Sequence, residues 1–110
     1  MMTVREYAKE NGFVYLTQGD LDKEIKGCYI SDLLSLAMSR VEEGQVWMTV
    51  QGNVNIAAVA ALTEPACILL VEGQKASEDT LARAKENEIT ILQTGRSAYE
   101  AACLLYEQMK

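Results

Sequence analysis

The strongest constraint on this chain is the alternation of strand-like and helix-like runs in its second half. Short β-branched or apolar runs occupy residues 45–50 (QVWMTV), 67–71 (CILLV) and 89–92 (ITIL), and a longer helix-like run follows each. Strands that are separated by helices pair in parallel through right-handed crossovers. The second half therefore predicts three parallel strands with helices on their faces.

The helices of this half carry start and stop signals. Residues 54–62 are alanine-rich and apolar on nearly every face, which predicts a buried helix that Pro65 ends. Residues 77–88 open on a serine N-cap followed by two acids, and their narrow apolar stripe, Leu81 and Ala84, predicts a surface helix.

The last helix is expected to begin at Ser97, because Glu100 three residues later completes a capping box. Its apolar residues recur with the 3.6-residue period of a helix, so we expect one broad inward face. That face comprises Ala98, Ala101, Ala102, Leu105 and Met109, widened by Cys103, Leu104 and Tyr106.

The first half has weaker patterns. Residues 3–12 predict a helix closed by Gly12, and residues 13–16 and 28–32 predict short strands. Residues 32–43 predict a further helix, and Gly44 suits its C-terminus. The inward side of the first helix is expected to carry Val4, Tyr7 and Ala8, and that of the second Leu33, Leu34, Ala37, Met38 and Val41.

The chain of 110 residues contains no linker and no charge block, so residues 1–110 are expected to form one domain. The predicted fold class is α/β. We expect a mostly parallel central sheet of about four to five strands with helices on both faces.

Charge and composition exclude several functions. The net charge is −6 and there is no histidine, so nucleic acid is a poor partner and the usual general base is missing. No phosphate-binding P-loop or GxGxxG motif is present. We expect no enzyme and no cofactor.

The three cysteines, Cys28, Cys67 and Cys103, form no CxxC pair and lie in apolar segments. This usage predicts buried structural thiols in a reducing cytoplasm rather than a zinc or redox site. The N-terminal residues are too charged for a signal peptide, and no apolar run is long enough to span a membrane.

One acidic segment imitates part of a calcium loop. Asp20, Asp22 and Glu24 have the right spacing, but Ile25 stands where such a loop needs glycine. We interpret the segment as a solvated turn and expect no metal.

Three polar, glycine-containing loops follow the three strands of the second half. Ligands of open parallel sheets bind beyond the carboxyl ends of the strands, where helix N-termini also point. The loops therefore form the candidate site for a small-molecule ligand. Its candidate residues are Gln51, Gly52, Asn53, Asn55, Glu72, Gly73, Thr94 and Arg96.

Each candidate also has a structural interpretation. One of Asn53 and Asn55 is expected to cap the following helix, which leaves the other amide spare for a ligand. Thr94 and Arg96 resemble an anion clip before a helix, but Arg96 is equally interpreted as a solvated charge.

Residues 30–106 resemble the DRTGG domain family. The family pattern runs from a strand through a G-D-R turn to an alanine-rich helix (here MTVQGNVNIAAVAAL), then to a strand ending in T-G-G (CILLVEGQKASEDTL). A strand ending in S/T-T before a helix completes it (ITILQTGRSAYEAACLLYE). The domain accompanies CBS domains in regulatory pyrophosphatases and occurs in phosphate acetyltransferases. Its fold is similar to the N-terminal domain of HPr kinase/phosphorylase.

The sequence departs from this family at its signature residues. Asn53 and Val54 replace the Asp-Arg pair, and Val71-Glu72-Gly73 replaces Thr-Gly-Gly. The charge pair is lost, so any role that it has in relatives does not transfer to this chain.

The resemblance implies a stand-alone bacterial regulatory module that is non-catalytic and senses a ligand, either a nucleotide or a phosphorylated metabolite, or serves oligomerisation. One alternative is an adaptor that binds a partner protein and no small molecule. Another is a small enzyme using carboxylates or Cys28. A homodimer is expected, and it would suit exposed apolar residues such as Trp47 or Tyr106, with the alternative that both belong to the core.

Overall fold

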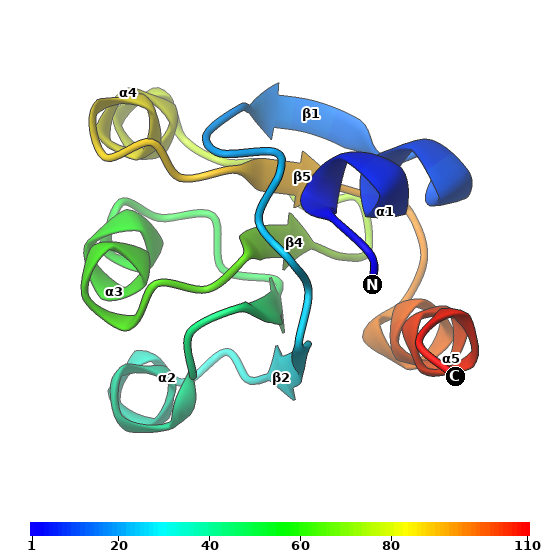
Figure 1. Cartoon of the computed structure of the whole chain (residues 1–110). Coiled ribbons are helices and arrows are strands. Elements are labelled where there is room, and N and C mark those ends of the chain that lie inside the picture. Colours follow the sequence, from blue (N-terminus) through cyan, green and yellow to red (C-terminus); the bar gives the residue numbers. More distant parts are fainter.

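Five strands form one sheet in the computed structural model, which describes all of residues 1–110 (Figure 1). Their order is β1 (Val14–Thr17), β5 (Ile91–Gln93), β4 (Cys67–Leu70), β3 (Gln45–Thr49) and β2 (Gly27–Ile30). Strands β2 to β5 are parallel, and β1 pairs antiparallel with β5. The predicted α/β class with a mostly parallel sheet is confirmed.

The helices cover both faces of this sheet. Figure 1 places α2 (Leu34–Arg40), α3 (Asn55–Thr63) and α4 (Glu78–Glu86) on one face, and α1 (Val4–Asn11) and α5 (Ala98–Gln108) on the other. None of the five has the length and apolar character that a membrane crossing requires.

Alternate residues of the central strands point to the two helical layers. Met48 of β3 and Leu69 of β4 belong to the core under α1 and α5. Trp47 and Ile68 are in register with each other and belong to the core under α2, α3 and α4. All residues of β4 are buried, as the apolar run CILLV predicts for a strand covered on both faces.

The helix boundaries that the sequence predicts from local signals are largely confirmed. Ser97 forms a capping box with Glu100, and the Ser77 hydroxyl accepts a hydrogen bond from the Thr80 N–H. Gly12 closes α1 with a φ of 68°, a left-handed conformation that glycine adopts without steric cost. These signals act within a few residues, which is why sequence alone reveals them.

The prediction for the second helix was wrong in part. Leu33 and Met38 are 58% and 42% exposed, because α2 lies at the edge of its layer over β2 and turns only a narrow side to the core. The helix ends at Arg40, and Gly44 instead lies in the turn before β3 with a φ of 85°.

Two expectations about burial, for α3 and for the thiols, also need correction, and the alternative that Trp47 belongs to the core is confirmed. Helix α3 is not buried all round, since its outer face meets solvent and Leu62 is 72% exposed. Trp47 is fully buried and donates its indole N–H to the Ser31 carbonyl over 3.0 Å, so it offers no exposed surface to a partner. Of the thiols, Cys67 alone is buried, while Cys28 is half-buried and Cys103 exposed.

A fully buried hydroxyl gives the first prediction. The Tyr7 hydroxyl has no hydrogen-bond partner in the protein, and burial raises the pKa of this phenol. An unpaired buried polar group costs about 1–3 kcal/mol. We therefore expect Tyr7→Phe to increase the free energy of unfolding by up to about 1–3 kcal/mol in urea titrations. Tyr99→Phe, at a 78% exposed position, is the control and should change nothing. Destabilisation by Tyr7→Phe would contradict this account.

Candidate functional site

The parallel strands bring four loops to one edge of the sheet. These loops follow β2, β3, β4 and β5 and comprise residues 31–33, 50–54, 71–77 and 94–97. Three of them are the loops singled out from the sequence. Every candidate residue lies in these three loops or, in the case of Asn55, in the first turn of α3.

The two asparagines of the β3–α3 loop have different roles. Asn53 Oδ1 accepts the N–H of Asn55 over 2.9 Å, and the Asn53 carbonyl accepts the N–H of Ile56. Asn53 therefore closes a turn in front of α3, but the N-cap of the helix is Val54 and no side chain caps it, so the expectation that one asparagine caps the helix was wrong. The Asn55 side chain is exposed in the first turn of α3 and takes part in no hydrogen bond. The spare amide expected from the sequence is thus Asn55.

A chain of side-chain contacts holds this loop in place. Gln51 accepts the Asn53 amide at 2.9 Å and donates to the Asp32 carbonyl at 3.3 Å. Asp32 Oδ1 accepts both the Thr49 hydroxyl and the Val50 N–H, each at 2.8 Å. One carboxylate thereby links the loop after β2 to the loop after β3.

Asp32 and Thr49 were not among the candidates drawn from the sequence. Their signal was the position of Asp32 at the end of the predicted strand 28–32. Only the parallel pairing of β2 with β3 identifies that position as a fourth carboxyl end at this edge. Because both acceptor bonds of Asp32 go to the protein, its role here is to position the loop.

Gly52 is required by a close approach of two backbones. A Cβ at this position would overlap the carbonyl oxygen of Lys75 in the next loop. The Gly52 carbonyl accepts the Ser77 N–H at 3.0 Å and the Thr80 hydroxyl at 2.8 Å. The β3–α3 loop therefore packs directly on the start of α4.

The candidates in the other two loops mainly bond to one another. The N–H groups of Glu72 and Gly73 donate to the carbonyls of Arg96 and Thr94, over 2.8 and 2.9 Å. The Thr94 hydroxyl accepts the Arg96 N–H over 3.2 Å. These backbone donors are therefore engaged within the protein.

Arg96 points its guanidinium to another element. Nη1 donates to the carbonyl of Asn11 at the C-terminus of α1, over 3.2 Å. A cation at that end complements the partial negative charge of the helix dipole. In this conformation Arg96 connects α5 to α1, and Lys75 is the other basic residue of the three loops, exposed and without an ion pair.

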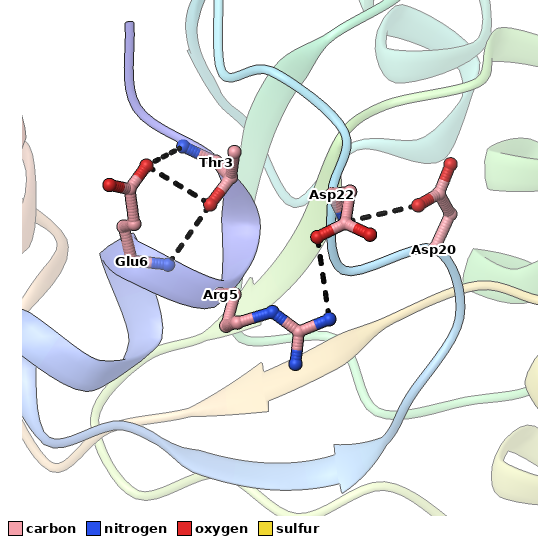
Figure 2. Close-up of polar contacts among 5 residues, drawn as sticks. All are labelled: Thr3, Arg5, Glu6, Asp20 and Asp22. Atoms are coloured by element: carbon pink, nitrogen blue, oxygen red, sulfur yellow. Dashed lines mark hydrogen bonds and ion pairs between the residues drawn. The ribbon is translucent and has the colours of Figure 1, made fainter.

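The acidic segment that imitates a calcium loop is a turn (Figure 2). Asp20 Oδ1 accepts the Asp22 N–H at 3.0 Å, and Asp22 forms an exposed ion pair with Arg5 at 3.3 Å. Figure 2 also shows the adjoining capping box of Thr3 and Glu6. The structure contains no group of three or more acidic or cysteine side chains arranged to hold a metal ion.

The thiols are poorly suited to nucleophilic chemistry. Burial raises the pKa of Cys28 to about 11, and burial also raises the pKa of Cys67. Both remain protonated at neutral pH, whereas the thiolate is the nucleophile. Neither cysteine has a histidine to activate it, because the chain has none.

Comparison with known proteins identifies a structural neighbour. No family model matches the sequence, and no curated protein matches it. The fold is similar to the crystal structure of the CBS and DRTGG domains of the regulatory region of Clostridium perfringens pyrophosphatase, complexed with the activator diadenosine tetraphosphate. The TM-score is 0.75 at 14% sequence identity, and the match covers 94% of this chain and 45% of that chain.

At this identity the likeness concerns the fold alone, and it supports a DRTGG-like fold. The chain spans about half the length of this neighbour, which is a regulatory rather than a catalytic region.

The contact at Gly52 gives a second prediction. Gly52→Ala would force the two loops apart, and overpacking of this kind costs about 1–3 kcal/mol. We expect a corresponding decrease in the free energy of unfolding. The matched control is Gly95→Ala, where no atom lies within 4 Å of the added Cβ and φ is not in the left-handed region. Equal stability of the two variants in urea titrations would show that the contact at Gly52 does not constrain the loops.

Proposed function

We propose that this chain is a non-catalytic regulatory module that binds a nucleotide or phosphorylated metabolite at the carboxyl edge of its sheet and associates with itself. The observation that carries the ligand proposal is the unpartnered Asn55 amide in the first turn of α3. Its neighbours Gln51 and Asn53 are already held by hydrogen bonds, so the loop is ordered before any ligand arrives.

The electrostatics of α3 favour an anionic ligand. Helices α1, α4 and α5 each carry acidic residues in the first turn, and α3 carries none. The positive end of the α3 dipole is therefore not compensated by a carboxylate, and anions bind at such helix ends. Exposed Lys75, in the loop that packs on Gly52, adds a positive charge nearby.

The fold likeness supports the same class of ligand. The neighbouring structure is a regulatory region in complex with a dinucleotide activator. We therefore propose that the chain belongs to the DRTGG family and that its ligand is a dinucleotide. Loss of the Asp-Arg pair means that neutral amides and backbone groups would make the contacts here.

Enzymatic function is disfavoured by the same residues. One oxygen of the Asp32 carboxylate, Oδ1, is held by Thr49 and Val50, and the half-buried Cys28 has a pKa of about 11. A catalytic acid, base or nucleophile needs a pKa close to the working pH. The loops therefore suit binding better than turnover.

The ligand proposal predicts the effect of one isosteric change. Asn55→Asp places a negative charge at the start of α3, which repels a phosphate but complements the helix dipole by about 0.3–1 kcal/mol. We expect ATP or diadenosine tetraphosphate to raise the melting temperature of the original protein, because binding to the folded state stabilises it. The variant should melt at the same or a higher temperature without ligand and lose the ligand-dependent shift.

Gln18→Glu is the matched control, since Gln18 is an exposed amide without a hydrogen bond in the loop after antiparallel β1. It should retain the full ligand-dependent shift. If neither nucleotide and no member of a panel of phosphorylated metabolites shifts the melting temperature, the sensing function is ruled out and the adaptor alternative is favoured.

A further inference from the structure

An apolar groove of about 790 Å³ lies between strand β2 and helix α5, away from the loops described above. Nine of its twelve lining residues are hydrophobic. Tyr99 and Tyr106 of α5 are 78% and 68% exposed, and Ile30 of β2 is 48% exposed. Apolar side chains gathered in this way on a surface mark an interaction site.

Strand β2 is also an unprotected edge of the sheet. Its residues Gly27–Ile30 include no charge and no proline, the usual protections against edge pairing. The opposite edge strand, β1, is interrupted by an irregularity between Tyr15 and Thr17, which disrupts further pairing. Figure 1 shows β2 at the free end of the sheet with α5 beside it.

The direction of the free backbone groups follows from the pairing with β3. Ser31 donates its N–H to the Met48 carbonyl over 3.3 Å and therefore points toward β3. Backbone groups of successive residues in a strand point to opposite sides, so those of Tyr29 also point toward β3 and those of Cys28 and Ile30 point outward. These outward groups are free to form a new ladder.

We propose that a second copy of this chain docks at β2 and α5, pairing β2 antiparallel with its own equivalent across a two-fold axis. This inference rests on the self-association proposed above and specifies its surface. Outward Cys28 of one copy then exchanges hydrogen bonds with Ile30 of the other, and the two sheets become one. The α5 helices of the two copies meet on the same face and cover each other's tyrosines.

The geometry suits a copy of the same chain because a two-fold interface needs a self-complementary surface. An edge strand paired antiparallel with itself meets that requirement, and so does a helix face that carries both of the exposed tyrosines. The register that pairs Cys28 with Ile30 places Tyr29 opposite its equivalent at the axis.

The charges of the groove permit the contact despite the net charge of −6 on each chain. The charged residues of its lining are Glu107 and Lys110, which form an ion pair over 3.4 Å. Two copies therefore bring equal numbers of positive and negative groups to the interface. Salt screens the repulsion between the other acidic side chains of the two copies at distances beyond about 10 Å.

The apolar area approaches what a stable dimer needs. Aromatic side chains offer about 150–250 Å² each, so the two exposed tyrosines contribute about 300 Å² per copy. Ile30, Cys103, Met109 and the outward backbone of β2 extend this patch. Specific interfaces begin near 600 Å² per partner, so the patch is of the right order.

Sedimentation equilibrium of the whole chain over a range of concentrations tests the proposal. We expect a monomer–dimer equilibrium, and Tyr106→Glu should raise its dissociation constant at least about 30-fold, because a charge would be buried at the interface centre. Ile30→Pro removes one outward N–H without removing a bond to β3, and it should weaken the dimer as well.

Each variant has a matched control. Leu62→Glu introduces the same charge at a 72% exposed apolar residue of α3, outside the groove, and should leave the dimer intact. Ile30→Val retains the N–H and an apolar β-branched side chain, so it should also dimerise. Circular dichroism of Tyr106→Glu, a surface change, establishes that the loss of dimer is not unfolding.

The outcomes separate this inference from the function proposed above. A dimer that survives both Tyr106→Glu and Ile30→Pro overturns the interface and leaves self-association standing. A wild-type chain that remains monomeric at all concentrations overturns the interface and self-association together. Ligand binding has its own test through Asn55 and is unaffected by either result.

Discussion

The burial of β3 and β4 on both faces is the constraint on which the rest of the structure depends. Every residue of β4 is buried, and β3 alternates Met48 toward one helical layer and Trp47 toward the other. A strand of this kind is stable only between two covering layers. The crossover helices α3 and α4 and the flanking helix α5 follow from that requirement, and so does the gathering of loops at one edge.

Local patterns could be predicted from the sequence, and contacts between distant segments could not. Ser97 and Glu100 are neighbours on one helix turn, so their capping box was visible in advance. The partner of Arg96 is the carbonyl of Asn11, 85 residues away, and no periodicity reveals it. The parallel sheet was predictable because alternation of strands and helices leaves few topologies.

Burial was predicted least well where an apolar residue lies on a helix at the surface or a strand at the centre. Leu62 was expected inside and is exposed, because α3 has an outer face that alanine and leucine occupy. Trp47 was considered for an exposed partner surface and is buried in a central strand. Hydrophobicity alone is the same in both cases, and only the position of the element in its layer distinguishes them.

The candidate loops keep their shape through contacts within the protein. Gly52 is needed by the Lys75 backbone and Asn53 by the first turn of α3, so both have structural reasons to be present. Asn55 has no such reason, because its amide contacts nothing in the protein. A single unpaired amide is a small signal, but it is the one polar group of the β3–α3 turn that the fold itself does not use.

The two surfaces of the molecule are connected through one carboxylate. Strand β2, the free edge, continues directly into the loop that carries Asp32, and Asp32 accepts hydrogen bonds from Thr49 and Val50 at the end of β3. The position of the loop that presents Asn55 therefore depends on where β2 ends. A partner that extends the sheet at β2 would hold the strand from which that carboxylate is positioned. The edge that pairs and the edge that presents the spare amide are consequently parts of one hydrogen-bonded unit.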